Sequence, residues 1–211
     1  MKTKITVISI LTSVLLALVG MTILTANPQK AFAYPPAVGI IGKAKDCLAC
    51  HVSNGPWKDD EKTIIDVIDK ETKRSFKQAD GSFLIKVKRG ETKTVLTLIG
   101  RTKEDEAGAS YRNAWVYVDP KTIASTSLSK FAPGWNVNLP MSCKLVGDKL
   151  EGYEGAKITV GPMTIRPTDA AQDAELTLQV MLTKGESVKG KPKEGMIGNY
   201  FERRVKLKVT D

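Results

Sequence analysis

Two cysteines and a histidine lie together near the start of the chain, as Cys47-Leu48-Ala49-Cys50-His51. Thiols two residues apart can serve as a redox pair, as metal ligands or as attachment points for a cofactor. His51 is the only histidine in the 211 residues, and Cys143 is the only other cysteine. Chemistry that needs both sulfur and imidazole is therefore concentrated at the segment from Cys47 to His51.

Two of these uses fit the surrounding sequence poorly. A thioredoxin-type pair lies between a strand and a helix of a βαβ unit, an arrangement that Pro56 and the strand-rich remainder of the chain do not supply. A zinc site would need Cys143 from far downstream, with Cys50 and His51 adjacent in sequence, which is awkward for a tetrahedral metal. A simple disulfide between Cys47 and Cys50 would leave the histidine unexplained. The pattern therefore favours cofactor attachment.

The motif Cys47-x-x-Cys50-His51 resembles the haem-attachment motif of cytochromes c. The resemblance implies that Cys47 and Cys50 bind one haem c covalently and that His51 is the axial nitrogen ligand of its iron. Trp57 follows closely and is expected to pack on the haem. The resemblance covers the motif alone, because the helices and the later methionine loop of small cytochromes c are not evident in this chain.

A second axial ligand must come from a residue other than histidine. Met196 lies in a Gly- and Lys-rich loop, Met141 follows Pro140, and Cys143 is the cysteine left over by the motif. Each also has an ordinary structural explanation, because loops carry isolated apolar residues and both Met and Cys pack well in cores. We expect a six-coordinate iron with a sulfur ligand, and we prefer Met196 slightly because its loop is predicted to lie at the haem end.

The first residues are typical of a secretory signal peptide. Lys2 and Lys4 precede an apolar run over 5–24, and Ala31-Phe32-Ala33 offers an A-x-A cleavage site. The apolar run is also long enough to span a bilayer, so an uncleaved anchor is the alternative. We expect cleavage after Ala33, which gives an exported protein in the periplasm or an equivalent extracytoplasmic compartment, with no membrane span in the mature chain.

The rest of the chain has the composition of a strand-rich globular protein. Hydrophobic residues make up 42% and charged residues 26%, with 17 Gly and 10 Pro. Short β-branched or alternating segments are separated by turn residues, as strands are. The expected strands are 64–68, 83–87, 95–99, 114–118, 135–139, 156–160, 163–165, 176–182 and 201–209.

Many short strands with frequent turns predict a mainly β protein, an immunoglobulin-like β-sandwich without the inter-sheet disulfide. The expected organisation is a signal peptide at 1–33, a short helical haem-attachment arm at 34–61 with a helix over 38–51, and the sandwich at 62–211 with its core at about 80–211. In this topology the loops 100–113 and 184–199 share one end of the sandwich. We expect the haem at that end, since the arm is too short to bury it alone.

The net charge of +9 points to acidic partners. An exported chain meets no nucleic acid, so an acidic protein or a membrane surface is the expected counterpart. Three basic clusters could steer an acidic redox partner, or could simply form a solvated surface. The clusters are Lys70, Lys73, Arg74 and Lys77; Lys184, Lys189, Lys191 and Lys193, which we favour; and Arg203, Arg204, Lys206 and Lys208.

The sequence therefore predicts an exported monohaem c-type cytochrome that transfers single electrons and is not itself an enzyme. It would act as a carrier or as an accessory subunit of a larger oxidoreductase complex, for which the nitrogen cycle offers one setting. The alternatives are a haem protein with an open iron that binds a gas or nitrogen oxide, and a structural subunit whose sandwich organises an assembly.

Overall fold

The computed structural model describes residues 46–49, 51–53, 60–104, 110–123, 131–185, 188, 191 and 194–211. The chain divides into two compact units, Met1–Ala33 and Tyr34–Asp211, and every described residue belongs to the second. The predicted signal peptide, Cys50 and Trp57 lie outside the described residues. None of the helices in the described ranges is long and apolar enough to cross a membrane.

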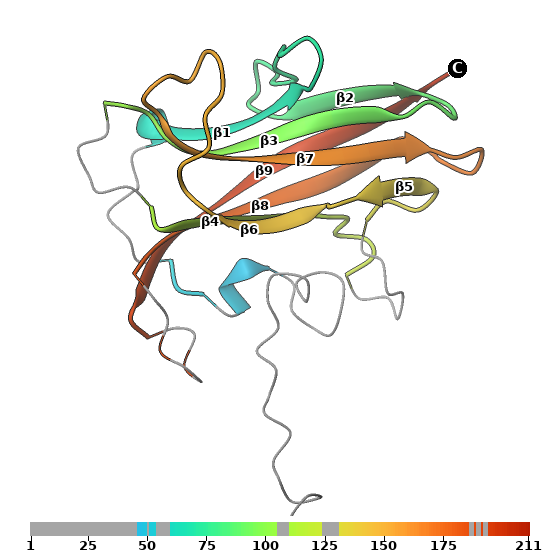
Figure 1. Ribbon diagram of the computed structural model, residues 1–211. Coiled ribbons are helices and arrows are strands. Elements are labelled where there is room, and N and C mark those ends of the chain that lie inside the picture. Colours follow the sequence, from blue (N-terminus) through green and yellow to red (C-terminus); the bar gives the residue numbers. More distant parts are fainter. Residues whose placement is uncertain are drawn as a thin grey trace, which may run out of the picture. The chain divides into compact units, whose positions relative to one another are not determined.

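Two β-sheets account for most of the described chain (Figure 1). The strands are β1 (Thr63–Asp69), β2 (Phe83–Lys88), β3 (Lys93–Arg101), β4 (Arg112–Val118), β5 (Trp135–Asn138), β6 (Met141–Leu145), β7 (Lys157–Pro167), β8 (Ala174–Gly185) and β9 (Met196–Thr210). One sheet has the order β1-β3-β7-β5 and the other β2-β9-β8-β4-β6. All neighbours are antiparallel except β2 and β9, which run parallel.

This strand order is that of an immunoglobulin-like sandwich. β1, β3, β7 and β5 take the places of strands A, B, E and D, while β9, β8 and β4 take those of G, F and C. The expectation of a mainly β, immunoglobulin-like sandwich is confirmed. Within the described ranges the helical elements are the 3-10 turns η2 (Cys47–Ala49) and η3 (Asp60–Lys62), and residues 38–45 of the expected helix lie outside those ranges.

The core lies between the two sheets and begins earlier in the chain than residue 80. Ile65 and Val67 of β1 are buried with Phe83, Ile85 and the inward residues of β8 in one cluster. Alternation along β1 and β2 places these side chains on the inner faces. The described part of the sandwich therefore includes β1.

One strand replaces the two that were expected at 156–160 and 163–165. β7 continues through Gly161 and Pro162 because both residues can be accommodated in the strand without breaking its pairing with β3. The Trp115 ring occupies the space that a Cβ on residue 161 would need. Pro162 pairs with Leu96 of β3, whereas β5 pairs with β7 only from Thr164 onward. At Pro162 the side of β7 that faces β5 further along the strand is therefore unpaired. A proline, which lacks an N–H, is tolerated at such a position because no hydrogen bond between strands is lost there.

Candidate functional site

The face of the five-stranded sheet that points away from the core carries an apolar surface. Tyr200, Met181, Ala114 and Cys143 lie side by side across β9, β8, β4 and β6. The next outward row is Glu202, Gln179, Val116 and Met141. The apolar members form a cluster separate from the sandwich core. We call this cluster the outer patch: Ala114, Val116, Val118, Met141, Cys143, Met181 and Tyr200.

The first cysteine of the motif is docked on the outer patch. Asp46 caps η2, because its carboxylate and its carbonyl both accept the N–H of Ala49, at 3.1 Å and 3.3 Å. This turn presents Cys47 to the sheet, where it is only 6% exposed and packs in the outer patch together with Leu48. The Cys47 thiol donates to Oε1 of Gln179 at 3.8 Å. Figure 1 shows η2 on the side of the five-stranded sheet that faces away from the other sheet.

The residues after the motif run along β9. The His51 N–H donates to the Cys47 carbonyl at 3.0 Å, and the Tyr200 N–H donates to Oγ of Ser53 at 3.2 Å. A Cβ on Gly198 would lie 2.9 Å from the carbonyl oxygen of Val52 and 2.8 Å from Sδ of Met181. Glycine therefore permits the close approach of this segment. The edge of β9 is open to it because β2 pairs with β9 only from Val205 onward.

Burial favours the neutral form of His51, which is the form that can bind a metal. Its ring is half-buried, and burial lowers the pKa of the imidazole below its ordinary value of 6.5. Its Nδ1 is buried and has no hydrogen-bond partner among the residues that the structure describes. A neutral imidazole with an unused nitrogen is the form in which histidine coordinates iron. The residue therefore fits the role that the motif predicts for it.

The nearby Tyr200 is also uncharged. Burial, together with the hydrogen bond from its hydroxyl to Oε1 of Glu202 at 2.5 Å, raises the pKa of the phenol well above 10. The part of the sheet beside Cys47 thus offers an apolar surface, with the carboxyl group of Glu202 at its border. Such a surface suits a macrocycle that is itself largely apolar.

The three candidate sixth ligands fall into two places. Met141 and Cys143 lie on β6 and belong to the outer patch that contains Cys47. Met196 begins β9 opposite Gly185, is half-buried, and lies at the hairpin end of the sheet. The structure thus brings two of the three candidate ligands into the outer patch, whereas Met196 lies further along β9 and is not part of that cluster.

The position of the motif differs from the expected one. The sequence placed the haem at the loop end of the sandwich, whereas Cys47 contacts Gln179 within β8, on the face of the sheet. The signal for this arrangement is present in β4. Its residues Ala114–Val118 are apolar at every position and all are buried. Such a run indicates a strand that is covered on both faces.

The residues present fit a haem. A thiol at Cys47, a neutral imidazole at His51 and the apolar outer patch provide attachment, an axial nitrogen and a dry surface. Within the ranges that the structure describes, no three His, Cys, Asp or Glu side chains gather as a protein metal cage requires. Haem iron needs no such cage, because the porphyrin itself supplies four of its ligands.

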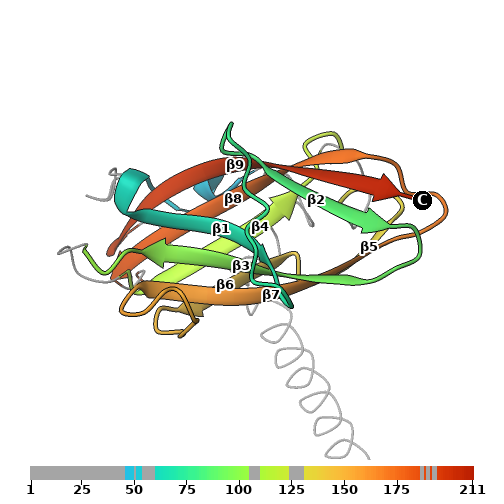
Figure 2. The ribbon, with the colours of Figure 1, turned by 90° about the horizontal axis from the view of Figure 1, so that it is seen from above.

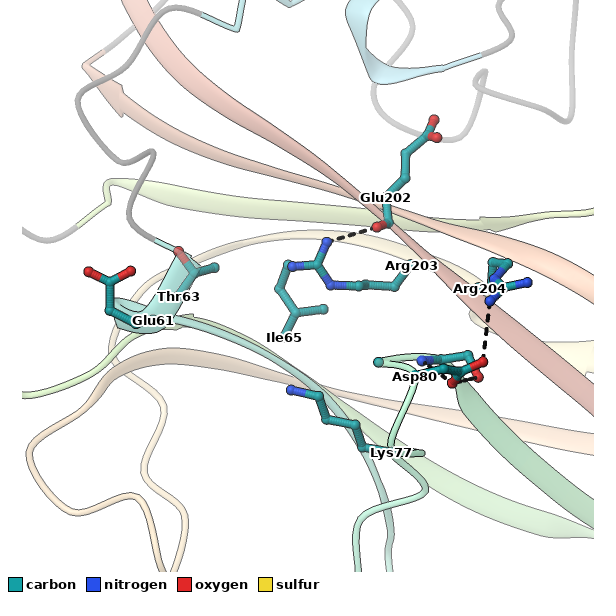
Figure 3. Close-up of a pocket in the computed structure, with 10 residues that line it drawn as sticks. Glu61, Thr63, Ile65, Lys77, Asp80, Glu202, Arg203 and Arg204 are labelled. Carbon is teal, nitrogen blue, oxygen red and sulfur yellow. Dashed lines mark hydrogen bonds and ion pairs between the residues drawn. The ribbon is translucent and has the colours of Figure 1, made fainter.

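A cavity of about 600 Å³ opens elsewhere, between β1 and β9 (Figure 3). Its lining mixes cations with carboxylates, and several of these groups interact with one another. Arg204 pairs with Asp80 at 3.2 Å, and Arg203 donates to the Glu202 carbonyl at 2.9 Å. Hydrogen bonds from Ser82 lower the pKa of Asp80 to about 2. Because the cavity is lined by both positive and negative side chains, it does not favour a ligand of either charge. We assign no function to it.

No protein-family model and no curated protein matches the sequence. Among solved structures, the chain is similar to the ASH / PapD-like domain of human CEP192 (PapD-like domain 7). The identity is 11% and the TM-score is 0.31, over 76% of this chain and 94% of that domain.

Proposed function

We propose that this protein is an exported monohaem c-type cytochrome that transfers single electrons, as a carrier or as an accessory subunit of a larger oxidoreductase. The observation that carries the proposal is the packing of Cys47 in an apolar patch on the sheet face, together with three further sulfur side chains, while His51 follows and donates to the Cys47 carbonyl. An isolated motif match would identify only a possible cofactor. Here the motif is held against a surface that suits the cofactor.

Each residue has a defined part in this proposal. Cys47 and Cys50 hold the haem covalently, and His51 supplies the axial nitrogen. The outer patch keeps water from one face of the haem, which favours a stable reduction potential. The bound haem contributes reversible one-electron oxidation of its iron. The protein positions the group and leaves an edge of it accessible to a partner.

Met141 and Cys143 are the sulfur side chains that we propose as alternatives for the sixth position. Both project from β6, where Cys143 lies opposite Ala114 and Met141 lies opposite Val116 of β4. A methionine ligand raises the potential of the iron, whereas a thiolate lowers it. The identity of this ligand would therefore decide which class of redox partner the protein serves.

The proposal is tested by expressing the full chain in a host that matures c-type cytochromes. Mass spectrometry of the product should show one haem on the peptide that contains Cys47 and Cys50, in a chain that begins at Tyr34. The variant Cys47→Ala/Cys50→Ala should lack covalent haem, while Cys143→Ala should retain it. A haem-free or zinc-containing product from the unaltered chain would refute the proposal. Complete and rapid binding of carbon monoxide would replace electron transfer with the open-iron alternative.

A further inference from the structure

The parallel pairing of β2 with β9 places lysines of two distant segments side by side. Lys86 lies directly opposite Lys208, and Leu84 lies opposite Lys206. Both strands alternate, so Ile85 and Leu207 point into the core while Lys86 and Lys208 are exposed on the outer face. Figure 2 shows β2 and β9 running together toward the C-terminus.

The charges on this face are only partly compensated. Asp80 pairs with Arg204 at 3.2 Å and with Lys206 at 3.5 Å, and Glu91 pairs with Lys88 at 3.8 Å. In the part of the chain that the structure describes, neither Lys86 nor Lys208 has an ion-pair partner. Like charges opposite one another, at a strand spacing of about 4.8 Å, destabilise a sheet. The fold thus gains nothing from this pair.

Protection of the sheet edge does not account for the arrangement. Lysines on an edge strand prevent unwanted strand pairing, and this would explain Lys86 on β2. Lys208 lies on β9 one residue beyond the last pair with β8, Ala174 with Leu207. On that side the next N–H of β9, from Val209, already donates to Oδ1 of Asp173 at 2.9 Å, so this short edge is closed without the lysine. A role toward an outside partner explains both residues.

We propose that this surface, the basic ribbon of Lys86, Lys88, Lys206 and Lys208, is a docking site for an acidic protein. Carboxylate side chains on a folded partner match a flat set of ammonium groups spaced along two strands. A lipid surface fits less well, because membrane-binding surfaces also insert apolar side chains. The large exposed hydrophobic residues among those described lie elsewhere: Tyr111, Leu139, Leu145, Val188 and Ile197.

The basic ribbon continues the face on which Cys47 is docked. Along β9 the outward residues run from Tyr200, beside the motif, to Lys206 and Lys208. Six residues of strand separate Tyr200 from Lys206 by about 20 Å. A partner bound there would sit beside the outer patch. Its role as an electron donor or acceptor rests on the proposed function, whereas the docking itself does not.

The basic cluster favoured from the sequence is a weaker candidate. Lys189 and Lys193 lie outside the described residues. Lys191 pairs with Glu194 at 3.0 Å. Only Lys184 and Lys191 of this cluster are therefore described, and they offer no pair of lysines in register such as Lys86 and Lys208.

The test uses the full mature chain labelled with nitrogen-15 and flavodoxin, an acidic electron carrier, as the probe. At low salt, chemical shift changes should map to the basic ribbon and disappear as added salt shortens the screening length from about 30 Å to about 8 Å. Lys86→Gln/Lys208→Gln should weaken binding by about tenfold. The same variant should keep the melting temperature of the parent or raise it, since it removes a repulsion.

Lys121→Gln/Lys149→Gln is the matched control, because it removes the same charge from two exposed positions outside the ribbon. Binding to this control should stay within about twofold of the parent. Equal weakening of binding in both variants would show that affinity depends on net charge and not on the basic ribbon, and would overturn the proposal. Ribbon-dependent binding to phosphatidylserine vesicles without binding to flavodoxin would assign the surface to membranes instead. Because shift mapping works on haem-free chain as well, failure of the haem proposal would not be mistaken for failure of docking.

Discussion

Sγ of Cys47 lies 3.8 Å from Oε1 of Gln179, which places the first cysteine of the motif on the central part of β8. The thiol is positioned by the sheet and by the Asp46 cap. The contact also makes the five-stranded sheet, and not the loops at its end, the surface against which a haem would rest. Substitutions in the sheet should therefore change the exposure and reactivity of Cys47.

Gly198→Ala should release the arm from the sheet. The added Cβ would meet the Val52 carbonyl at 2.9 Å and Met181 at 2.8 Å, distances that force one of them to move. In haem-free protein the Cys47 thiol, now 6% exposed, should be alkylated at least about tenfold faster, because reaction then requires less local opening. Peptide mass spectrometry after timed iodoacetamide treatment measures the rate.

Ser53→Ala is the milder companion of that change. It removes only the acceptor of the 3.2 Å hydrogen bond from the Tyr200 N–H, worth about 1 kcal/mol. Alkylation of Cys47 should therefore rise by about fivefold or less. An unchanged rate in Gly198→Ala would mean that the arm does not depend on its contact with β9.

The sixth ligand should come from β6. Met141→Ala or Cys143→Ala should convert the haem-loaded protein from a low-spin to a high-spin spectrum, since both side chains share the outer patch with Cys47. Met196→Ala should leave the spectrum unchanged, because that residue lies at the hairpin end opposite Gly185. Absorption and electron paramagnetic resonance spectra of the three variants decide the matter. Loss of the low-spin signal in Met196→Ala alone would reverse the assignment.

Lowering the pH from 3.8 through 2 should protonate the Asp80 carboxylate and so remove its interactions. Ser82 donates both its hydroxyl and its backbone N–H to this carboxylate, at 2.6 Å and 3.0 Å, and holds its pKa at about 2. A carboxylate with a lowered pKa stabilises the fold above its unfolded value of 3.8, and the contribution is lost as the pH falls from there through 2. Carbon-13 NMR titration should give this pKa directly.

Ser82→Ala should raise the pKa of Asp80 part of the way toward 3.8, because it removes the hydroxyl bond, which is the largest cause of the shift, and keeps the backbone N–H bond. Lys206→Gln should raise it less, since the 3.5 Å ion pair contributes less than the serine does. The reverse order would show that the charge of the basic ribbon, and not the turn, controls this carboxylate.

Much of the sandwich could be predicted from the alternation of its strands. Phe83, Ile85 and Val87 alternate with polar or exposed residues, and the long alternating segments of β8 and β9 carry the same signal. β6 was missed as a strand because Met141–Leu145 follows Pro140 and shows no alternation in burial. Its residues lie at the edge of the sheet and are half-buried on average, a state that leaves little periodicity in the sequence.

The site was less accessible to sequence reasoning than the fold. The motif could be recognised from the spacing of Cys47, Cys50 and His51. Its location could not, because that depends on the apolar outer face of β4, on which Cys47 packs. The parallel register that joins Lys86 to Lys208 is equally hidden, because it links segments far apart in the chain. Pairing of that kind is set by packing of the whole domain and not by local pattern.

The last prediction concerns where the folding unit begins. A chain that starts at Asp60 should still unfold cooperatively in urea because it keeps both sheets intact, although it loses the contacts of the arm with the outer patch and with Tyr200. A chain that starts at Asp80 loses β1, and with it Ile65 and Val67, which are 6% and 0% exposed. Loss of two such side chains removes about 3 kcal/mol or more of stabilisation.

The shorter chain also loses a polar contact. Arg101 is 1% exposed and donates to Oγ1 of Thr63 at 2.7 Å, so the truncation removes one partner of a buried cation. The Asp80 chain should therefore be largely unfolded or aggregate, with a weak strand signal in circular dichroism. Equal stability of the two chains would show that β1 is dispensable, and would move the start of the sandwich back to residue 80.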